Sequence, residues 1–214
     1  MAQTLPTILV LPGGGYSRLA PHEGEPVVAW LRSIGWNARV VEYPIATKHP
    51  APLLAIQSEI AQERAAGATI VGVLGFSAGG HLAGHAAVAP IAKPEERPDF
   101  AVLGYPVVTM TGETHQGSRE NLIGLDANRL LREDTSLDLL VTKATPPMFI
   151  WHTAVDEPVP VDKHSYPLAA ALAAAGVRHE LHVFSDGEHG LGLAEGTPAE
   201  AWQSLCEIWL SSQR

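Results

Sequence analysis

The sequence predicts one α/β domain, a three-layer sandwich with a mostly parallel central sheet of about six strands. Short apolar segments rich in β-branched residues alternate with helical segments along the 214 residues. Most of the apolar segments are near-continuous, as expected of strands buried on both faces of a parallel sheet. Hydrophobic residues make up 46% of the chain and charged residues 17%. This balance excludes a disordered protein, and the length suits a single domain over residues 1–214.

The predicted strands are five or six residues long and are separated by segments that can hold a crossover helix. In such a pattern each strand, crossover and next strand form a right-handed unit. The six expected strands are Thr7–Leu11, Ala38–Tyr43, Thr69–Leu74, Phe100–Tyr105, Met148–His152 and Glu180–Phe184.

The segments between the strands carry helix start and stop signals. Gly35 follows one helical stretch, and another has Pro52 in its first turn and Gly67 just past its end. Proline near the start and glycine after the end are typical of helices. The expected helices are Glu25–Ile34, Ala51–Ala66, Ser77–Val88, His164–Ala175 and Pro198–Leu210.

One segment, Val107–Pro147, interrupts this alternation. It is polar, contains three glycines, and carries only a weak helical stretch at Asn128–Leu140. A connection of this length is unusual in such a fold, and long insertions are often functional. We interpret residues 107–147 as an insertion that forms a lid or a substrate loop, with a surface excursion as the alternative.

The charge balance limits the partners. Lys and Arg number 14 against 23 Asp and Glu, which gives a formal net charge of -9. Nucleic acids and anionic membranes require a basic surface, so neither is expected as a partner. The single cysteine, Cys206, cannot form an intramolecular disulfide, and the apolar run 8–11 is too short for a signal-peptide core or a membrane span. We therefore expect a cytoplasmic protein.

The central chemical motif is Gly75–Gly80, which reads G-F-S-A-G-G. It follows a predicted strand and opens a predicted helix, as a nucleophile elbow requires. The sharp turn exposes the Ser77 hydroxyl, while Gly75 and Gly79 let strand and helix approach each other. The pattern G-x-S-x-G is weak alone, but the strand before it and the helix after it make it specific.

A serine nucleophile needs a base, and the base needs an acid to orient it. Asp156 lies in the loop after one predicted strand, and His189 lies in the loop after the next. The carboxyl ends of parallel strands meet at one edge of the sheet, so both loops can converge on Ser77. The order Ser77, Asp156, His189 is the order of an α/β-hydrolase triad.

Other acids lie close to these loops. Glu157, Asp162 and Asp186 compete with Asp156. Asp162 is expected to cap the following helix, and Asp186 suits a turn before Gly187. Asp156 is preferred because it lies nearest the strand end.

Other histidines have structural explanations. His152 and His182 fall within predicted strands, where a histidine is more often a satisfied structural residue than a catalyst. His81 and His85 are one helical turn apart, a spacing that could suit a metal. Because no third ligand has suitable spacing, we expect both to be structural and predict no metal site.

An oxyanion hole requires backbone N–H donors near the serine. One should be the N–H of Ala78, and another should come from the glycine-rich segment Pro12–Tyr16 after the first strand. Three glycines allow this backbone to curl and aim its N–H groups. A dinucleotide-binding loop is excluded because the segment lacks G-x-G-x-x-G.

The whole set resembles α/β-hydrolase esterases of the acetyl-xylan and feruloyl esterase type. The resemblance implies an α/β-hydrolase fold that lacks the usual first strands, with Ser77, Asp156 and His189 as the triad. It also implies Gly14, Gly15 and Ala78 as oxyanion donors. The family usually has histidine where Pro12 stands. The matching segments are Pro12–Tyr16, Gly75–His81, Tyr105–Val107, His115–Gly124, Asp156–Pro160 and His189–Gly190.

The expected function is a serine carboxylic-ester hydrolase that works through an acyl-enzyme and needs no cofactor. The resemblance implies short acyl groups such as acetyl, on small carbohydrate or alcohol esters. Tyr16 and Trp151 are expected to line the substrate site. A serine peptidase or amidase on the same fold and a non-catalytic binding protein are the alternatives. The sequence predicts no oligomeric state.

Overall fold

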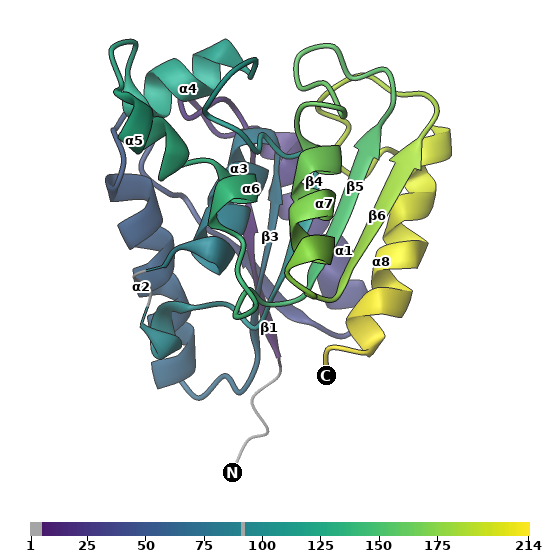
Figure 1. The fold of residues 1–214 in the computed structure, drawn as a ribbon. Helices are drawn as coiled ribbons and strands as arrows, with labels where there is room; N and C mark the ends of the chain where they lie inside the picture. Colours follow the sequence, from purple (N-terminus) through teal and green to yellow (C-terminus); the bar gives the residue numbers. More distant parts are fainter. Residues whose placement is uncertain (1–5, 91–92) are drawn as a thin grey trace.

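The computed structural model describes residues 6–90 and 93–214 (Figure 1). Within these ranges six strands form one sheet in the order β2-β1-β3-β4-β5-β6, and all neighbouring strands are parallel. The prediction of a mostly parallel sheet of about six strands is therefore confirmed. The strands are β1 (Thr7–Leu11), β2 (Asn37–Val40), β3 (Val71–Phe76), β4 (Phe100–Gly104), β5 (Met148–Thr153) and β6 (His179–Phe184).

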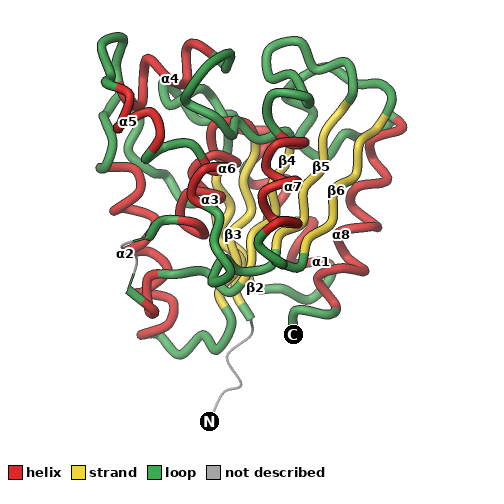
Figure 2. Tube along the Cα trace, viewed as in Figure 1, coloured by secondary structure: helices red, strands yellow, loops and turns green. Residues whose placement is uncertain are grey.

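Helices cover both faces of the sheet, so the fold has three layers (Figures 1 and 2). One face carries α1 (Glu25–Ser33) and α8 (Trp202–Ser211). The opposite face carries α2 (Ala51–Ala65), α3 (Ser77–Val88), α6 (Leu137–Leu140) and α7 (Ser165–Ala174). The shorter elements are η1 (Pro21–Glu23), η2 (Pro94–Glu96), α4 (Gln116–Ile123), α5 (Arg129–Glu133) and η3 (Pro198–Ala201).

The strands contribute alternate side chains to two hydrophobic cores. In β1, Leu9 and Leu11 belong to the core under α2, α3 and α7, while Ile8 and Val10 belong to the core under α1 and α8. Side chains of a strand point alternately to the two faces of a sheet. Burial of both faces explains why the four central strands read as near-continuous apolar runs.

Two strands, β2 and β3, have bounds that differ from the prediction by two residues or more. β2 ends at Val40 rather than Tyr43, because its only partner is β1 and the pairing stops at Val10–Val40. β3 spans Val71–Phe76, two residues later than predicted, since pairing with β4 continues to Phe76. An apolar run does not indicate where its neighbours stop pairing.

The insertion contains more helix than predicted, in shorter pieces. The stretch Asn128–Leu140, predicted as one helix, is divided into α5 and α6. The Oγ atoms of Thr135 and Ser136 donate to backbone carbonyls of the preceding turn, and Ser136 also accepts the N–H of Met110. Such hydroxyls compete with helical hydrogen bonding. Helix α4 was not predicted, and Figure 1 shows it with α5 near the end of the sheet to which the strand arrows point.

Within the described ranges, none of the helices combines the length and apolar character needed to cross a membrane.

Candidate active site

Ser77 occupies the sharp turn between β3 and α3. Its φ is 53°, in the left-handed region that non-glycine residues rarely adopt. The turn brings backbones into close contact: a Cβ at Gly79 would lie 2.1 Å from the carbonyl oxygen of Leu11, and one at Gly75 would lie 2.2 Å from that of Gly79. Glycine is therefore required at both positions, and the strained turn holds Ser77 at the carboxyl end of the sheet.

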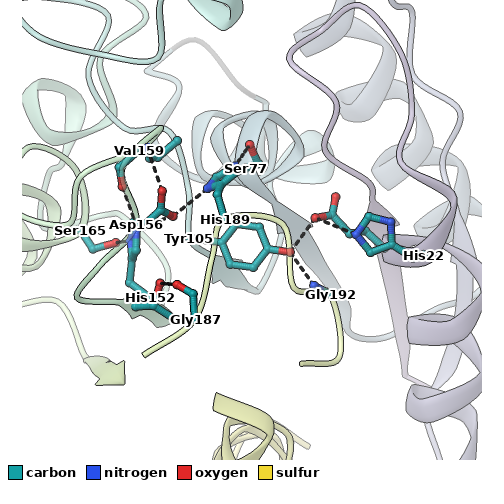
Figure 3. A network of polar contacts seen from close by, with 12 residues as sticks. His22, Ser77, Tyr105, His152, Asp156, Val159, Ser165, Gly187, His189 and Gly192 are labelled. Atoms are coloured by element: carbon teal, nitrogen blue, oxygen red, sulfur yellow. Dashed lines mark hydrogen bonds and ion pairs between the residues drawn. The ribbon is translucent and has the colours of Figure 1, made fainter. Parts of the chain in front are cut away.

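The structure brings Ser77, His189 and Asp156 together in a hydrogen-bonded chain (Figure 3). His189 Nε2 lies 2.8 Å from Ser77 Oγ, and His189 Nδ1 lies 2.7 Å from Asp156 Oδ2. Asp156 follows β5 and His189 follows β6, so the strand-end loops converge as predicted. If the Nδ1–H donates to Asp156, Nε2 is free to accept the Ser77 proton.

Asp156 is a buried carboxylate, only 3% exposed. Its Oδ1 accepts the N–H of Val159 at 2.9 Å, and its Oδ2 lies 3.2 Å from His152 Nε2. Burial alone raises the pKa of Asp156, but hydrogen bonds from His152 and His189 outweigh it and lower the pKa to about 2. The group is therefore ionised across the neutral range and can orient His189.

His152 is the second histidine that contacts the Asp156 carboxylate. It lies in β5 and is fully buried, with Nε2 also 2.8 Å from the carbonyl oxygen of Val159 and Nδ1 2.7 Å from Ser165 Oγ. Both ring nitrogens are thus satisfied within the protein. His152 is held as a structural residue would be, but it also fixes Asp156.

The competing acids lie apart from this chain of hydrogen bonds. Glu157, Asp162 and Asp186 are exposed. Asp162 pairs with Lys163 at 2.9 Å, and α7 begins only at Ser165, so the expectation that Asp162 caps this helix is wrong. The N-cap residue is His164, and the backbone N–H groups of His164 and Tyr166 donate to the carbonyl oxygen of Val161.

The remaining candidate histidines have protein partners. His81 Nδ1 lies 2.7 Å from the Tyr16 hydroxyl and its Nε2 lies 2.8 Å from the carbonyl oxygen of Thr135. His85 contacts the carbonyl oxygen of Asp134, and His182 pairs with a glutamate on the edge strand β6. Among the described residues, no group of three or more His, Cys, Asp or Glu is arranged to hold a metal ion.

The glycine-rich loop is braced by side chains from elsewhere. The Tyr43 hydroxyl donates to the carbonyl oxygen of Pro12 at 2.6 Å, and the N–H of Gly13 donates to Glu23 Oε2 at 2.7 Å. The N–H of Gly13 therefore already has an acceptor within the protein and is not free to bind a ligand. In the described part of the chain, the N–H groups of Gly14 and Gly15 donate to no protein acceptor. They remain available to a ligand, as do the first N–H groups of α3, which have no helical partner.

Glu23 is a site residue that the sequence analysis missed. It is 2% exposed, and its Oε1 accepts the Tyr105 hydroxyl at 2.6 Å. Tyr105 in turn accepts the N–H of Gly192 at 2.7 Å and packs edge-on against the His189 ring. Burial, followed by the charge of Glu23, raises the pKa of Tyr105, so the phenol stays protonated. Glu23 thus links the glycine loop to the loop that carries His189.

A cavity of about 440 Å³ opens beside Ser77. Its walls come from the glycine loop, from α4 and the residue before it, and from the His189 loop. The lining is mostly small or polar. It consists of Gly14, Gly15, Ser17, Arg18, Ala20, His22, Glu23, Ser77, His115, Gly117, Asn121, His189 and Gly190.

Tyr16 and Trp151 do not line this cavity. Tyr16 is 1% exposed and turns its hydroxyl to His81. Trp151 is fully buried and stacks on Trp202 with ring centroids 5.1 Å apart. Both rings stabilise the core around the site, and neither offers the exposed surface that a substrate wall needs.

Comparisons with known proteins agree with this architecture. The model of the prolyl oligopeptidase family matches residues 48–211. An acetyl ester-xyloside bifunctional hydrolase from Caldicellulosiruptor lactoaceticus has a similar solved structure, with a TM-score of 0.91 and 42% identity over 99% of this chain and 84% of that one. The six parallel strands thus form an α/β-hydrolase fold, as the sequence predicted.

Two curated relatives are longer than this chain. Endo-1,4-beta-xylanase B of Butyrivibrio fibrisolvens is 36% identical over 91% of this chain and 34% of its own length. Acetylxylan esterase of Xylanibacter ruminicola is 31% identical over 86% of this chain and 41% of its own length. The chain therefore spans between a third and about two fifths of these relatives, and the similarity agrees with the predicted likeness to acetyl-xylan esterases.

Proposed function

The chain belongs to the prolyl oligopeptidase family of α/β-hydrolases, and from this premise we propose that it is a serine carboxylic-ester hydrolase. The hydrogen-bonded chain Ser77–His189–Asp156 carries the proposal. A nucleophile, a base and an orienting acid within hydrogen-bond reach are what acyl transfer requires. Three of its relatives are named as an acetylxylan esterase, an acetyl ester-xyloside hydrolase and a carboxylesterase.

The first half-reaction forms an acyl-enzyme. Ser77 Oγ attacks the ester carbonyl carbon while its proton moves to His189 Nε2. Asp156 stabilises the imidazolium that forms. Negative charge builds on the carbonyl oxygen, and the N–H groups of Gly14, Gly15 and Ala78 are the proposed donors to it. The C–O bond then breaks, and the leaving alcohol takes the proton from His189.

The second half-reaction frees the enzyme. A water gives a proton to His189 Nε2 and attacks the acyl carbon, which forms a second tetrahedral intermediate. This collapses to the carboxylic acid, and the Ser77 oxygen recovers its proton from His189. No cofactor takes part in the proposed cycle.

The proposed substrates are short-chain esters, such as acetates, of small carbohydrates or other alcohols. The cavity supports this choice because its volume of about 440 Å³ is modest and several of its lining side chains are polar. The names of the relatives support it as well. The insertion is proposed to act as a substrate loop, since His115, Gly117 and Asn121 line the cavity.

The decisive experiment replaces Ser77 with alanine. We expect Ser77→Ala to lose at least about 10³-fold in kcat on an activated acetyl ester, with an unchanged melting temperature. A serine-directed phosphonate should label the wild type at the peptide that contains Ser77. Ser17→Ala is the matched control, because Ser17 lines the same cavity and should leave phosphonate labelling intact. Wild-type turnover by folded Ser77→Ala would refute the mechanism.

Matched ester and amide substrates distinguish this function from that of a peptidase or amidase. We expect acetyl esters to be cleaved much faster than the corresponding acetamides. Faster cleavage of the amide would assign the same site to amide hydrolysis. Failure of the folded wild type to react with the phosphonate would indicate a binding protein.

A further inference from the structure

One histidine of the insertion faces the same cavity as Ser77. His115 immediately precedes α4, and its half-buried side chain lines the cavity together with Ser77 and His189. The hydrogen bonds of the proposed mechanism do not use it.

The protein fixes the tautomer of His115. Its Nδ1 lies 3.2 Å from the backbone N of Ser118 and 2.8 Å from Ser118 Oγ. A backbone N–H can only donate, so Nδ1 accepts and carries no proton. A neutral imidazole then bears its proton on Nε2. Burial, followed by the charge of His189, lowers the pKa of His115, which keeps the ring neutral at neutral pH.

The ring is held beside the glycine loop. Its Cε1 would lie 3.8 Å from a Cβ built on Gly15, and α4 is tied to this loop because Asn121 Nδ2 donates to the carbonyl oxygen of Gly15 at 2.8 Å. Lys48 Nζ donates to two carbonyls at the end of α4. In the described ranges no protein acceptor contacts His115 Nε2. The Nε2–H is therefore a positioned donor available to a ligand.

We propose that His115 is a substrate-binding residue that donates its Nε2–H to a hydroxyl oxygen on the alcohol part of the ester. The inference rests on the proposed ester hydrolase and names one source of its selectivity. The surrounding polar side chains of Ser17, Arg18 and Asn121 suit an alcohol with several hydroxyls.

The test separates this role from capping of α4. His115→Asn keeps the cap, because asparagine Oδ1 can accept the Ser118 N–H, but it removes the Nε2 donor. The substrates are methyl xyloside monoacetate and cyclohexyl acetate, two ring acetates that differ in hydroxyls. We expect His115→Asn to lower kcat/KM about tenfold for the xyloside, mainly through KM, and less than about twofold for cyclohexyl acetate.

Two results with His115→Asn would overturn the proposal. Unchanged selectivity in folded His115→Asn would mean that the histidine only caps the helix, and an equal loss on both substrates would mean that it acts on the site as a whole. His115→Gln is the second variant, because its amide N–H reaches toward the Nε2 position while its cap is weaker. It should retain part of the xyloside preference despite a lower melting temperature; complete loss of the preference in a folded His115→Gln would count against the proposal.

Two controls keep the inference apart from the proposed function. Turnover of either acetate by folded Ser77→Ala would refute the mechanism whatever the selectivity of His115→Asn. Loss of the xyloside preference in His115→Asn, with phosphonate labelling of Ser77 retained, supports the assignment of His115 within an intact mechanism.

Discussion

Asp156 and Glu23 are both buried carboxylates beside the Ser77–His189 pair, but their partners differ. Asp156 contacts two imidazoles, those of His189 and His152. Glu23 accepts from a backbone N–H and from the Tyr105 phenol, and the nearest imidazole nitrogen, of exposed His22, lies 3.8 Å away. Figure 3 shows Asp156 and the Tyr105 hydroxyl on different sides of His189.

Because their partners differ, the two buried carboxylates are expected to have different roles. In the proposed cycle His189 becomes positively charged, so Asp156 stabilises a charge that exists only during the reaction. The two groups that donate to Glu23, a backbone N–H and a phenol, carry no charge at any step of the cycle. Glu23 instead fixes the direction of the Gly13 peptide and, through Tyr105, of Gly192. Loss of Asp156 should therefore affect the chemical step, and loss of Glu23 should affect the placement of the groups that perform it.

The largest expected effect comes from Asp156→Asn. Asparagine can donate to His189 Nδ1 and favour the wrong tautomer, so kcat should fall about 10⁴-fold. Kinetics on an activated acetyl ester measure this. Asp162→Asn and Asp186→Asn are matched controls, because both acids are exposed and should be replaceable without loss of activity. A loss in Asp186→Asn as large as in Asp156→Asn would show that the acid is misassigned.

Glu23→Gln should have a smaller effect on kcat, about 10- to 100-fold, because a misplacement of roughly 1 Å can reduce a rate about 10²-fold. Gly13 and Tyr105 donate to different oxygens of Glu23, and glutamine replaces one of these oxygens with an NH2 donor, so one of the two groups loses its acceptor. The pH dependence of kcat should keep its shape. Glu25→Gln, on the exposed face of α1, is the control. A loss equal to that of Asp156→Asn would remove the distinction between the two carboxylates.

Tyr105→Phe should reduce kcat only a few-fold and lower stability by about 2 kcal/mol. Phenylalanine fills the space against Trp151 and His189 but leaves Glu23 Oε1 and the Gly192 N–H without their partner. Urea unfolding measures the stability. Wild-type stability together with wild-type kcat would argue that the Glu23 network does not couple the two loops.

The smallest expected effect concerns the stability of the folded protein in acid. Burial, followed by the charge of His152, lowers the pKa of His164 to about 3, so this ring is neutral in the folded protein. Protonation therefore favours the unfolded state, and stability should decline as pH falls below the ordinary histidine value of about 6.5. His164→Asn, whose Oδ1 can accept the Val108 N–H, should move the midpoint of acid unfolding, followed by circular dichroism, about half a pH unit lower. An unmoved midpoint would show that other groups govern acid unfolding.

The sequence predicted the parts of the site that follow from strand order. Ser77, Asp156 and His189 each follow the carboxyl end of a strand, and these ends meet at one edge of a parallel sheet. Glu23 could not be found this way, because it lies in a three-residue helix without periodicity and its partner Tyr105 is 82 positions away.

Local sequence also did not predict whether an aromatic side chain points into the core or into the cavity. Tyr16 and Trp151 are adjacent to motif residues, but an aromatic ring there packs into the core or lines a cavity depending on its neighbours in space. Trp202, on the distant helix α8, holds Trp151 in the core. The division of Asn128–Leu140 into two helices likewise depends on Ser136 accepting from Met110, a contact across the insertion.

The contact between Gly79 and the carbonyl oxygens of Leu11 and Pro12 has a practical meaning for laboratory evolution. The serine turn and the glycine loop touch backbone to backbone, so a side chain introduced at Gly79 would push the two apart. One introduced at Gly75 would collide with the backbone of Gly79 and Gly80 inside the serine turn. Libraries that randomise these positions should contain mostly inactive members. Diversity placed in the segment that carries His115 and Asn121 would instead vary one wall of the cavity and leave the serine turn intact.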